Sequence, residues 1–357
     1  MELDFAEVLM QVMEQGASDL HLTAGAPPMV RKRGQLSPLD YPALNPQVVR
    51  EIVYSILSND QRQRLETDWQ IDLAYSIPGK ARFRVNAFFQ RDSLGAAFRL
   101  IPSEMPALDS LGLPPILRDL TRKPRGFVLV TGPTGSGKST TLAAMIDVIN
   151  QSRHEHIMTV EDPIEFLHRH KSCIINQREI GADAQSFAMA LKAALRQDPD
   201  VILVGEMRDL ETISTALTAA ETGHLVFATL HTQDTAQTVD RIVDVFPPSQ
   251  QQQVRVQLSV ALQGIVTQQL LPTADGMGRC CAAEILIPTP AVRNLIREGK
   301  THQIYSTLQT GGSHGMQTMD SSLADLVRRD KITRELAEAR SSSPEELRRL
   351  MGTVKAA

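Results

Sequence analysis

The sequence has few aromatic residues, few cysteines and no long apolar run. Aromatic residues fill only 4% of its 357 positions, which leaves little surface on which the bases of single-stranded nucleic acid could stack. The three cysteines, Cys173, Cys280 and Cys281, form no C-x-x-C pair, so we expect a reducing compartment and no zinc site. The N-terminus lacks the basic region of a secretory signal, and no uncharged apolar run approaches the ~18 residues of a membrane span. We therefore predict a cytoplasmic protein without a span of its own.

An excess of charge of one sign is also missing. The chain has 37 Lys and Arg against 41 Asp and Glu, for a net charge of −4. This balance gives no electrostatic reason to expect binding to nucleic acid or to an acidic membrane. Apolar residues make up 42% of the chain and charged residues 22%, as in ordinary globular proteins. The length predicts two or three domains.

The first hundred residues predict a small α+β domain. Residues 81–90 place Phe83 and Val85 on one face and Arg82 and Arg84 on the other, the alternation of a half-buried strand. The other elements of this region are expected as helices near 5–13, 46–57 and 59–66 and as strands near 19–22, 70–76 and 93–101.

A proline-rich stretch separates this region from a second domain. Residues 102–115 carry four prolines and little periodicity, which predicts a linker between an N-terminal domain, 1–101, and a second domain, 116–357. The second domain alternates strands with helices, so we expect a mostly parallel sheet. Its predicted strands lie near 126–131, 155–160, 172–177, 201–204, 224–230, 265–271 and 281–287, and its helices near 138–150, 185–197, 209–222, 234–244, 249–262, 289–298, 317–330 and 333–339.

A glycine-rich loop between a predicted strand and a predicted helix carries the clearest chemistry. Gly132-Pro-Thr-Gly-Ser-Gly-Lys-Ser139 fits the pattern G-x-x-x-x-G-K-[ST] of a P-loop. Backbone amides of such a loop cradle phosphates, while Lys138 reaches the β- and γ-phosphates and the Ser139 hydroxyl ligates Mg²⁺. The sequence thus predicts ATP and Mg²⁺ as ligands. The candidate binding residues are Thr134, Gly135, Ser136, Gly137, Lys138, Ser139 and Thr140.

Two acidic segments follow apolar strands. The first ends in Gly205-Glu206, where many P-loop enzymes have Asp before Glu, so we expect Glu206 to meet Mg²⁺ through water rather than directly. The second holds Glu161, Asp162 and Glu165, three carboxylates that are costly to keep together without a cation or a reacting water nearby. Glu161 and Glu206 are both candidates for the general base, and the sequence does not choose between them.

Further candidates are a histidine and three arginines. His224 and His231 flank the strand 225–230, and His231, at its carboxyl end, is placed to sense a γ-phosphate. Arg82, Arg84 and Arg99 project from strands of the N-terminal domain, either as a solvated face or as fingers for a neighbouring subunit's nucleotide. Spacing alone does not decide between these two roles.

Seven segments together resemble a known family. The chain is similar to the secretion-type hexameric ATPases and, within them, to the retraction ATPases of type IV pili, over about residues 5–335. The segments are GASDLHL (16–22), GPTGSGKSTT (132–141), TVEDPIEF (159–166), DPDVILVGEMRDLET (198–212), ETGHLVFATLHT (221–232), AVRNLIREGK (291–300) and HGMQTMD (314–320).

The resemblance implies an α/β architecture in which a PAS-like α+β domain precedes a RecA-like P-loop ATPase domain with a helical C-terminal part. It implies a homohexamer at the cytoplasmic side of the inner membrane, a platform protein of the pilus machine as partner, and an accessory paralogue. It also implies roles for single residues. Glu161, Asp162 and Glu165 match the Asp box, Gly205 and Glu206 an atypical Walker B strand, His224 and His231 the His box, and Arg84 and Arg99 the arginines that reach the neighbouring subunit's nucleotide.

The resemblance implies that the protein is an ATP-hydrolysing motor. Such a motor powers pilus retraction and twitching motility through rotation between its domains. Two alternatives remain at this point. One is an accessory ATP-binding paralogue that does not hydrolyse, and the other is a RecA-like motor that moves nucleic acid, which the charge and the few aromatic residues disfavour.

Overall fold

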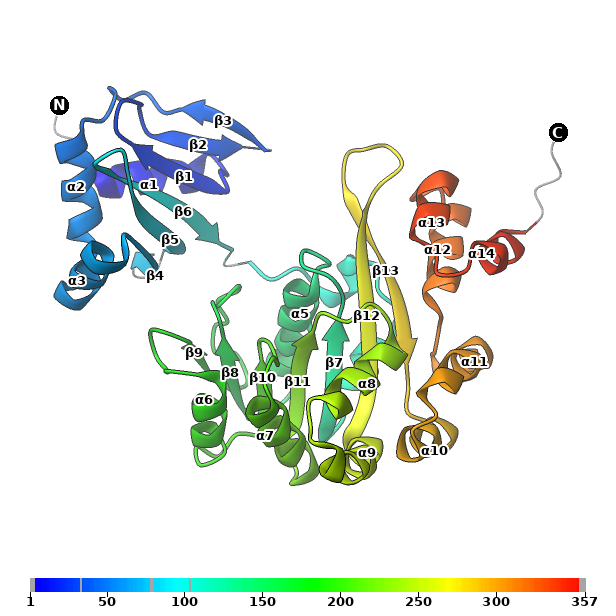
Figure 1. Cartoon of the computed structure of the whole chain (residues 1–357). Helices are drawn as coiled ribbons and strands as arrows, with labels where there is room; N and C mark the ends of the chain where they lie inside the picture. The colour runs from blue at the N-terminus through cyan, green and yellow to red at the C-terminus, as the bar shows by residue number, and fades with distance from the viewer. Residues whose placement is uncertain (1–3, 33, 78–79, 103, 353–357) are drawn as a thin grey trace, which may run out of the picture. The chain divides into compact units, whose positions relative to one another are not determined.

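The chain folds into two compact units, 1–103 and 104–357 (Figure 1). The structure, a computed structural model, describes residues 4–32, 34–77, 80–102 and 104–352. None of the helices in these ranges is long and apolar enough to cross a membrane.

The first unit is an antiparallel sheet of six strands, in the order β3-β2-β1-β6-β5-β4, with three helices. On β5 the predicted alternation is confirmed, because Phe83 and Val85 are fully buried while Arg84 is exposed. The PAS-like assignment of this unit stays a prediction. The elements are α1 (Phe5–Glu14), β1 (Asp19–Thr23), β2 (Met29–Lys32), β3 (Gln35–Pro38), α2 (Pro46–Ser55), α3 (Asn59–Asp68), β4 (Gln70–Ile77), β5 (Ala81–Gln90) and β6 (Ser93–Ile101).

The hairpin of β2 and β3 is absent from the expectations. Both strands have only four residues, and Val30 is the one fully buried side chain among them. Such short segments show no alternation that could reveal them. Their place is set by pairing with β1, where Leu20 lies opposite Val30.

The second unit is built on a sheet of seven strands in the order β13-β12-β7-β11-β10-β8-β9. All neighbouring pairs are parallel except β12 with β13, so the expected α/β alternation is confirmed. The strands are β7 (Gly126–Thr131), β8 (His156–Glu161), β9 (Ile174–Glu179), β10 (Val201–Val204), β11 (Leu225–Leu230), β12 (Leu262–Pro272) and β13 (Arg279–Leu286).

Helices cover both faces of this sheet (Figure 1). One face buries its side chains with α4, α5 and the short helix η1, and the other with α6 to α11. The short helix includes Leu108, buried in that core, so part of the segment expected as a linker is folded into the second unit. The helices are η1 (Leu108–Leu111), α4 (Ile116–Thr121), α5 (Lys138–Ser152), α6 (Phe187–Ala194), α7 (Leu210–Glu221), α8 (Thr235–Asp244), α9 (Pro248–Ala261), α10 (Pro290–Glu298) and α11 (Ile304–Thr310).

Three further helices, α12 (Met319–Arg328), α13 (Arg334–Arg340) and α14 (Pro344–Met351), close the chain. They bury Leu323 and Leu347 against Leu271 and Ala282 of the β12–β13 hairpin. Helix α14 lies in the tail 340–357, for which the sequence leaves a docked helix and a loose tail as alternatives. Of that tail, residues 353–357 lie outside the described part of the chain.

The topology gathers the functional loops at one edge. Because β7, β8, β10, β11 and β12 are parallel, their carboxyl ends point the same way, and ligands of open α/β sheets bind outside such ends. Glu161 is the last residue of β8, and the loops that follow β7, β10 and β11 carry the P-loop, Glu206 and His231.

Candidate active site

The P-loop leaves β7 and returns as the first turn of α5. Gly132 has a φ of 135°, and a Cβ atom there would lie 2.3 Å from the Gln268 carbonyl oxygen and 2.7 Å from Ser136 Oγ. Gly135 and Gly137 also have positive φ, 79° and 91°. Glycine is therefore needed for this path, which places backbone amides at the N-terminus of a 15-residue helix, a binding site for phosphate.

Lys138 lies across the loop. Its Nζ donates to the carbonyl oxygens of Gly132 (2.8 Å) and Pro133 (3.0 Å), and the residue is 9% exposed. Burial lowers the pKa of Lys138, and the negative charge of Glu206 opposes that shift. The two carbonyl groups thus hold the ammonium against the P-loop, and Glu206 is close enough to affect its pKa.

The hydroxyl groups of the loop differ in their surroundings. Ser139 and Thr134 are exposed, and the Ser139 hydroxyl has no hydrogen bond to any residue that the structure describes. Ser136 Oγ is buried and equally without a partner there. A free hydroxyl at Ser139 is available as a ligand for Mg²⁺ beside phosphate oxygens and water.

Glu206 follows β10 and sits between Arg208 and His231. Its Oε2 accepts from Arg208 Nη2 at 2.7 Å, and its Oε1 lies 2.9 Å from His231 Nε2. The hydrogen bond from Arg208 and the neighbouring His231 hold the pKa of Glu206 below its usual range, so this carboxylate stays ionised. Nothing in the sequence pattern pointed to Arg208, two positions after the glutamate.

Gly205 explains why this strand departs from the usual Asp-Glu ending. A Cβ atom at Gly205 would lie 3.1 Å from Glu161 Cα and 3.2 Å from the Val160 carbonyl oxygen. Thr229 Oγ1 donates to the Gly205 carbonyl at 2.5 Å from the other side. The end of β10 is therefore too tightly packed between β8 and β11 for a larger residue without a shift of its neighbours.

Glu161 is the last residue of β8, and its Cα lies beside Gly205. It is 8% exposed, and its Oε1 accepts from Thr159 Oγ1 (2.7 Å) and Gln177 Nε2 (3.2 Å). Burial raises the pKa of Glu161. The two glutamates thus have pKa values shifted in opposite directions, an arrangement typical of acid–base pairs in active sites.

The three neighbouring carboxylates differ in their exposure. Asp162 and Glu165 are exposed while Glu161 is buried, and the charge of Glu165 contributes to the raised pKa of Glu161. Within the described ranges, no group of three or more His, Cys, Asp or Glu side chains is arranged to hold a metal ion. A cation here would depend on Ser139 and on the phosphates of the nucleotide.

The two histidines of 221–232 lie at opposite ends of β11. His231 reaches Glu206, as expected for a residue at the carboxyl end. His224 Nδ1 lies 3.0 Å from the Ala219 carbonyl oxygen near the end of α7, and a strand of six residues separates it from the site by about 20 Å. The structure therefore brings only His231 to the candidate site.

Arg84 and Arg99 belong to the first unit. They lie opposite each other on β5 and β6, and both are exposed. Arg99 Nε donates to Asp19 Oδ1 at 2.9 Å, which gives the Asp19 of the segment 16–22 a part in orienting that arginine. Their role at a neighbouring subunit's nucleotide stays a prediction.

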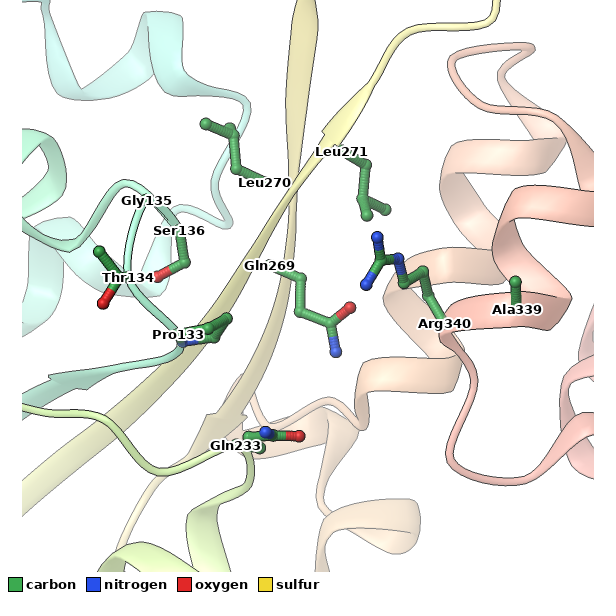
Figure 2. A pocket seen from close by; sticks show the side chains of 10 residues that line it. All are labelled: Pro133, Thr134, Gly135, Ser136, Gln233, Gln269, Leu270, Leu271, Ala339 and Arg340. Carbon is green, nitrogen blue, oxygen red and sulfur yellow. The ribbon is translucent and has the colours of Figure 1, made fainter.

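A pocket of about 500 Å³ opens beside the P-loop. Figure 2 shows its walls, which come from the loop, from the end of β12 and from the end of α13. The lining residues are Pro133, Thr134, Gly135, Ser136, Gln233, Gln269, Leu270, Leu271, Ala339 and Arg340.

Known proteins share both the sequence and the structure. The family model described as Type II/IV secretion system protein matches residues 2–349. The type IV pilus retraction ATPase PilT of Pseudomonas aeruginosa is 52% identical over 343 residues, 96% of this chain and 99% of that protein. The type IV pilus ATPase PilU of the same organism is 43% identical over 346 residues, 97% of this chain and 91% of that protein. A crystal structure of the pilus retraction motor PilT with bound ADP has a TM-score of 0.91 at 53% identity and covers 98% of this chain and 100% of its own.

These similarities extend over both units, and they include the P-loop, the two glutamates and His231 within the matched residues. The geometry around Lys138 and Glu206 independently indicates a nucleotide-binding site, because the ammonium lies on the P-loop and the carboxylate acts on it. The chain belongs to the Type II/IV secretion system protein family.

Proposed function

We propose that this protein is an ATPase that retracts type IV pili and thereby drives twitching motility. The observation that carries the proposal is the P-loop with Lys138 beside an ionised Glu206, in a chain 52% identical to PilT over nearly its full length. PilT itself is named a pilus retraction ATPase and has been crystallised with ADP.

In this proposal the phosphates of ATP enter the P-loop. Backbone amides at the start of α5 and the Lys138 ammonium bind them. Thr134 to Thr140 form the cradle, and the Ser139 hydroxyl, with Glu206 through water, would hold Mg²⁺. When bound, Mg²⁺ neutralises charge that develops on the phosphate oxygens.

The two glutamates take different parts. Glu206 is ionised and faces Lys138, so we assign it the orientation of the attacking water. Burial raises the pKa of Glu161, which makes its carboxylate a better proton acceptor, and its Cα lies directly against Gly205. We therefore propose Glu161 as the general base, acting beside Glu206, and His231 as the group that senses the γ-phosphate through Glu206.

Six copies would form the working ring. Arg84 and Arg99, exposed on the first unit, would stabilise transition-state charge on the nucleotide of the adjacent subunit, as arginine fingers do. Release of phosphate would rotate one domain against the other, and the ring would pass that motion to an inner-membrane platform protein. The protein would thus be cytoplasmic and peripheral at the base of the pilus machine, with a PilU-like paralogue as a possible partner and no nucleic acid.

The alternative of a PilU-like accessory protein is disfavoured. The identity to PilU, 43%, is lower than the identity to PilT, 52%, at nearly equal coverage. Glu161 and Glu206 are also both present, each with its own hydrogen-bond partners. The chain therefore has the two carboxylates to which the proposal assigns hydrolysis.

Pilus retraction in cells tests the proposal. The chain, expressed in a bacterium whose retraction ATPase gene is deleted, should restore twitching, and the Lys138→Ala variant at equal abundance should not. If both fail while the purified chain hydrolyses ATP, the motor assignment is wrong. If both restore twitching, the chain acts without hydrolysis, as an accessory protein would.

A further inference from the structure

A side chain of the edge strand β9 contacts the glutamate assigned above as general base. Gln177 Nε2 donates to Glu161 Oε1 at 3.2 Å. The two residues come from neighbouring parallel strands (Figure 1), and the residue paired with Gln177 in the register is Thr159, two positions before Glu161. None of the chemistry assigned above uses Gln177.

The two carboxylate oxygens of Glu161 differ in their contacts. Oε1 accepts from Gln177 and also from Thr159 Oγ1 at 2.7 Å. Within the described chain, Oε2 has only a long contact of 3.5 Å to the amide of Glu165. The last side-chain torsion of a glutamate is otherwise loosely restrained, so two donors on Oε1, from different strands, fix the plane of the carboxylate. Oε2 is thereby the oxygen that stays available to accept a proton.

The amide of Gln177 also binds the segment 162–168, which follows Glu161. Its Nε2 donates to the Phe166 carbonyl oxygen at 2.9 Å, and its Oε1 accepts from the His168 amide at 2.8 Å. Both N–H donors and the carbonyl group of the side chain are therefore in use. The amide has one fitting orientation, because in the reverse one its oxygen would face the carboxylate and the Phe166 carbonyl. Its donor is thus held on Glu161.

The contact with Gln177 also favours the charged form of Glu161. Burial raises the pKa of this carboxyl group, while the hydrogen bonds from Thr159 and Gln177 oppose that rise. A general base has to be deprotonated before it can accept a proton. Gln177 therefore acts on both the orientation and the charge of Glu161, through an amide that does not itself titrate.

We propose that Gln177 is a positioning residue for hydrolysis, whose amide holds Glu161 so that Oε2 accepts a proton from the attacking water. In this step the water oxygen bonds to the γ-phosphorus as the bond from that phosphorus to ADP breaks. This inference rests on the proposed role of Glu161 in ATP hydrolysis. None of the three hydrogen bonds of Gln177 described above goes to the P-loop, so the residue should affect the chemical step and not the affinity for nucleotide.

Single-turnover hydrolysis of ATP by the full chain, beside calorimetric titration with MgADP, tests the proposal. Gln177→Met keeps the length of the side chain and removes its three hydrogen bonds. Gln177→Glu, the second variant, keeps the acceptor for the His168 amide but has no donor for Glu161. Each variant should lower the rate of hydrolysis by roughly 10²-fold, the loss that a misplaced reacting group causes, and leave the affinity for MgADP unchanged.

Asn176→Ala is the matched control. Asn176 precedes Gln177 on β9, is exposed, and its Nδ2 lies 2.8 Å from His156 Nε2, so its loss should change neither the rate nor the affinity. An unchanged rate in the Gln177 variants would overturn the proposal. Equal losses of rate and of MgADP affinity would also overturn it, because they would indicate a general distortion of the site.

A double-mutant cycle shows whether Gln177 acts through Glu161. Gln177→Met should cause little further loss of rate in the Glu161→Gln background, where the carboxylate to be positioned is gone. A loss as large as in the wild-type background would contradict the positioning role.

The pH profile of the single-turnover rate gives a second readout. Without the hydrogen bond from Gln177, Glu161 should be protonated more readily, so the acid limb of the profile should move to higher pH in Gln177→Met. The acids on the elements around Glu161, which are Glu165, Glu179 and Glu206, are the same in both proteins. An acid limb that stays in place would contradict the proposal. A wild-type chain that hydrolyses no ATP would overturn the proposed function and this inference with it, whereas unchanged hydrolysis in the Gln177 variants would overturn this inference alone.

Discussion

His231 Nε2 lies 2.9 Å from Glu206 Oε1 although the two residues follow different strands, β11 and β10. Glu206 in turn acts electrostatically on Lys138 of the P-loop. The loop that carries His231 leads into α8, whose first amide is held by Glu284. Glu206 and Glu284 thus contact the two ends of the loop between β11 and α8.

Loss of His231 should slow hydrolysis more than binding. In His231→Ala, Glu206 keeps Arg208 but loses the partner that turns its other oxygen toward the site, so we expect kcat to fall by about 10²-fold, with ADP affinity nearly unchanged. Steady-state kinetics and calorimetry measure the two effects. His302→Ala, an exposed histidine outside the site, serves as the control, and a loss of kcat no larger than in that control would contradict the role of His231.

Arg84 should act on the nucleotide of a neighbouring subunit. Arg84→Ala and Lys138→Ala proteins should each be inactive, because every interface in such a ring lacks one of the two groups. Mixed before assembly, they should recover ATPase activity, since some interfaces then join an intact arginine to an intact P-loop. A mixture that stays inactive, although both proteins enter one ring, would place Arg84 outside the neighbouring site.

Gly205→Ala should destabilise the second unit. The added Cβ atom would meet Glu161 Cα at 3.1 Å and the Val160 carbonyl oxygen at 3.2 Å, and overpacking of this kind costs about 1–3 kcal/mol. Calorimetric melting should show a lower Tm. Gly312→Ala is the control, since a Cβ atom at Gly312 would meet nothing within 4 Å, and equal shifts in the two variants would contradict the packing argument.

Glu161 should make stability fall as pH rises. Burial raises its pKa above 4.5, so from about pH 4.5 upward the folded chain holds a proton that the unfolded chain has released. The free energy of unfolding therefore decreases with increasing pH across that window, whereas below it the contribution is fully present. Urea unfolding of the wild type and of Glu161→Gln at several pH values measures the effect. The difference between them should grow in favour of the glutamine variant as pH rises, and parallel curves would show that Glu161 does not titrate there.

The local patterns of the sequence predicted much of this site. The glycines and Lys138 of the P-loop, the acids that end β8 and β10, and His231 all sit at strand ends, where alternation of strands and helices already places ligands. Most strands and longer helices of the second unit were predictable because periodic segments carry a strong signal, whereas the short helices η1, α4 and α11 were not expected.

Contacts between distant segments left no such signal. Gly205 is required only because β8 and β11 press on the end of β10. Gln177 looks in the sequence like one polar residue on an ordinary strand, and only the pairing of β8 with β9 brings it to Glu161. The β2–β3 hairpin was missed because its strands are too short to alternate.

The rate of ATP hydrolysis by the purified chain, measured against protein concentration and beside Lys138→Ala, tests the central claim most directly. A ring whose sites are shared between subunits should show a rate per subunit that rises steeply with concentration and then levels off, and the variant should show no hydrolysis at any concentration. Nucleotide binding without turnover in the wild type, or equal turnover in Lys138→Ala, would contradict the account.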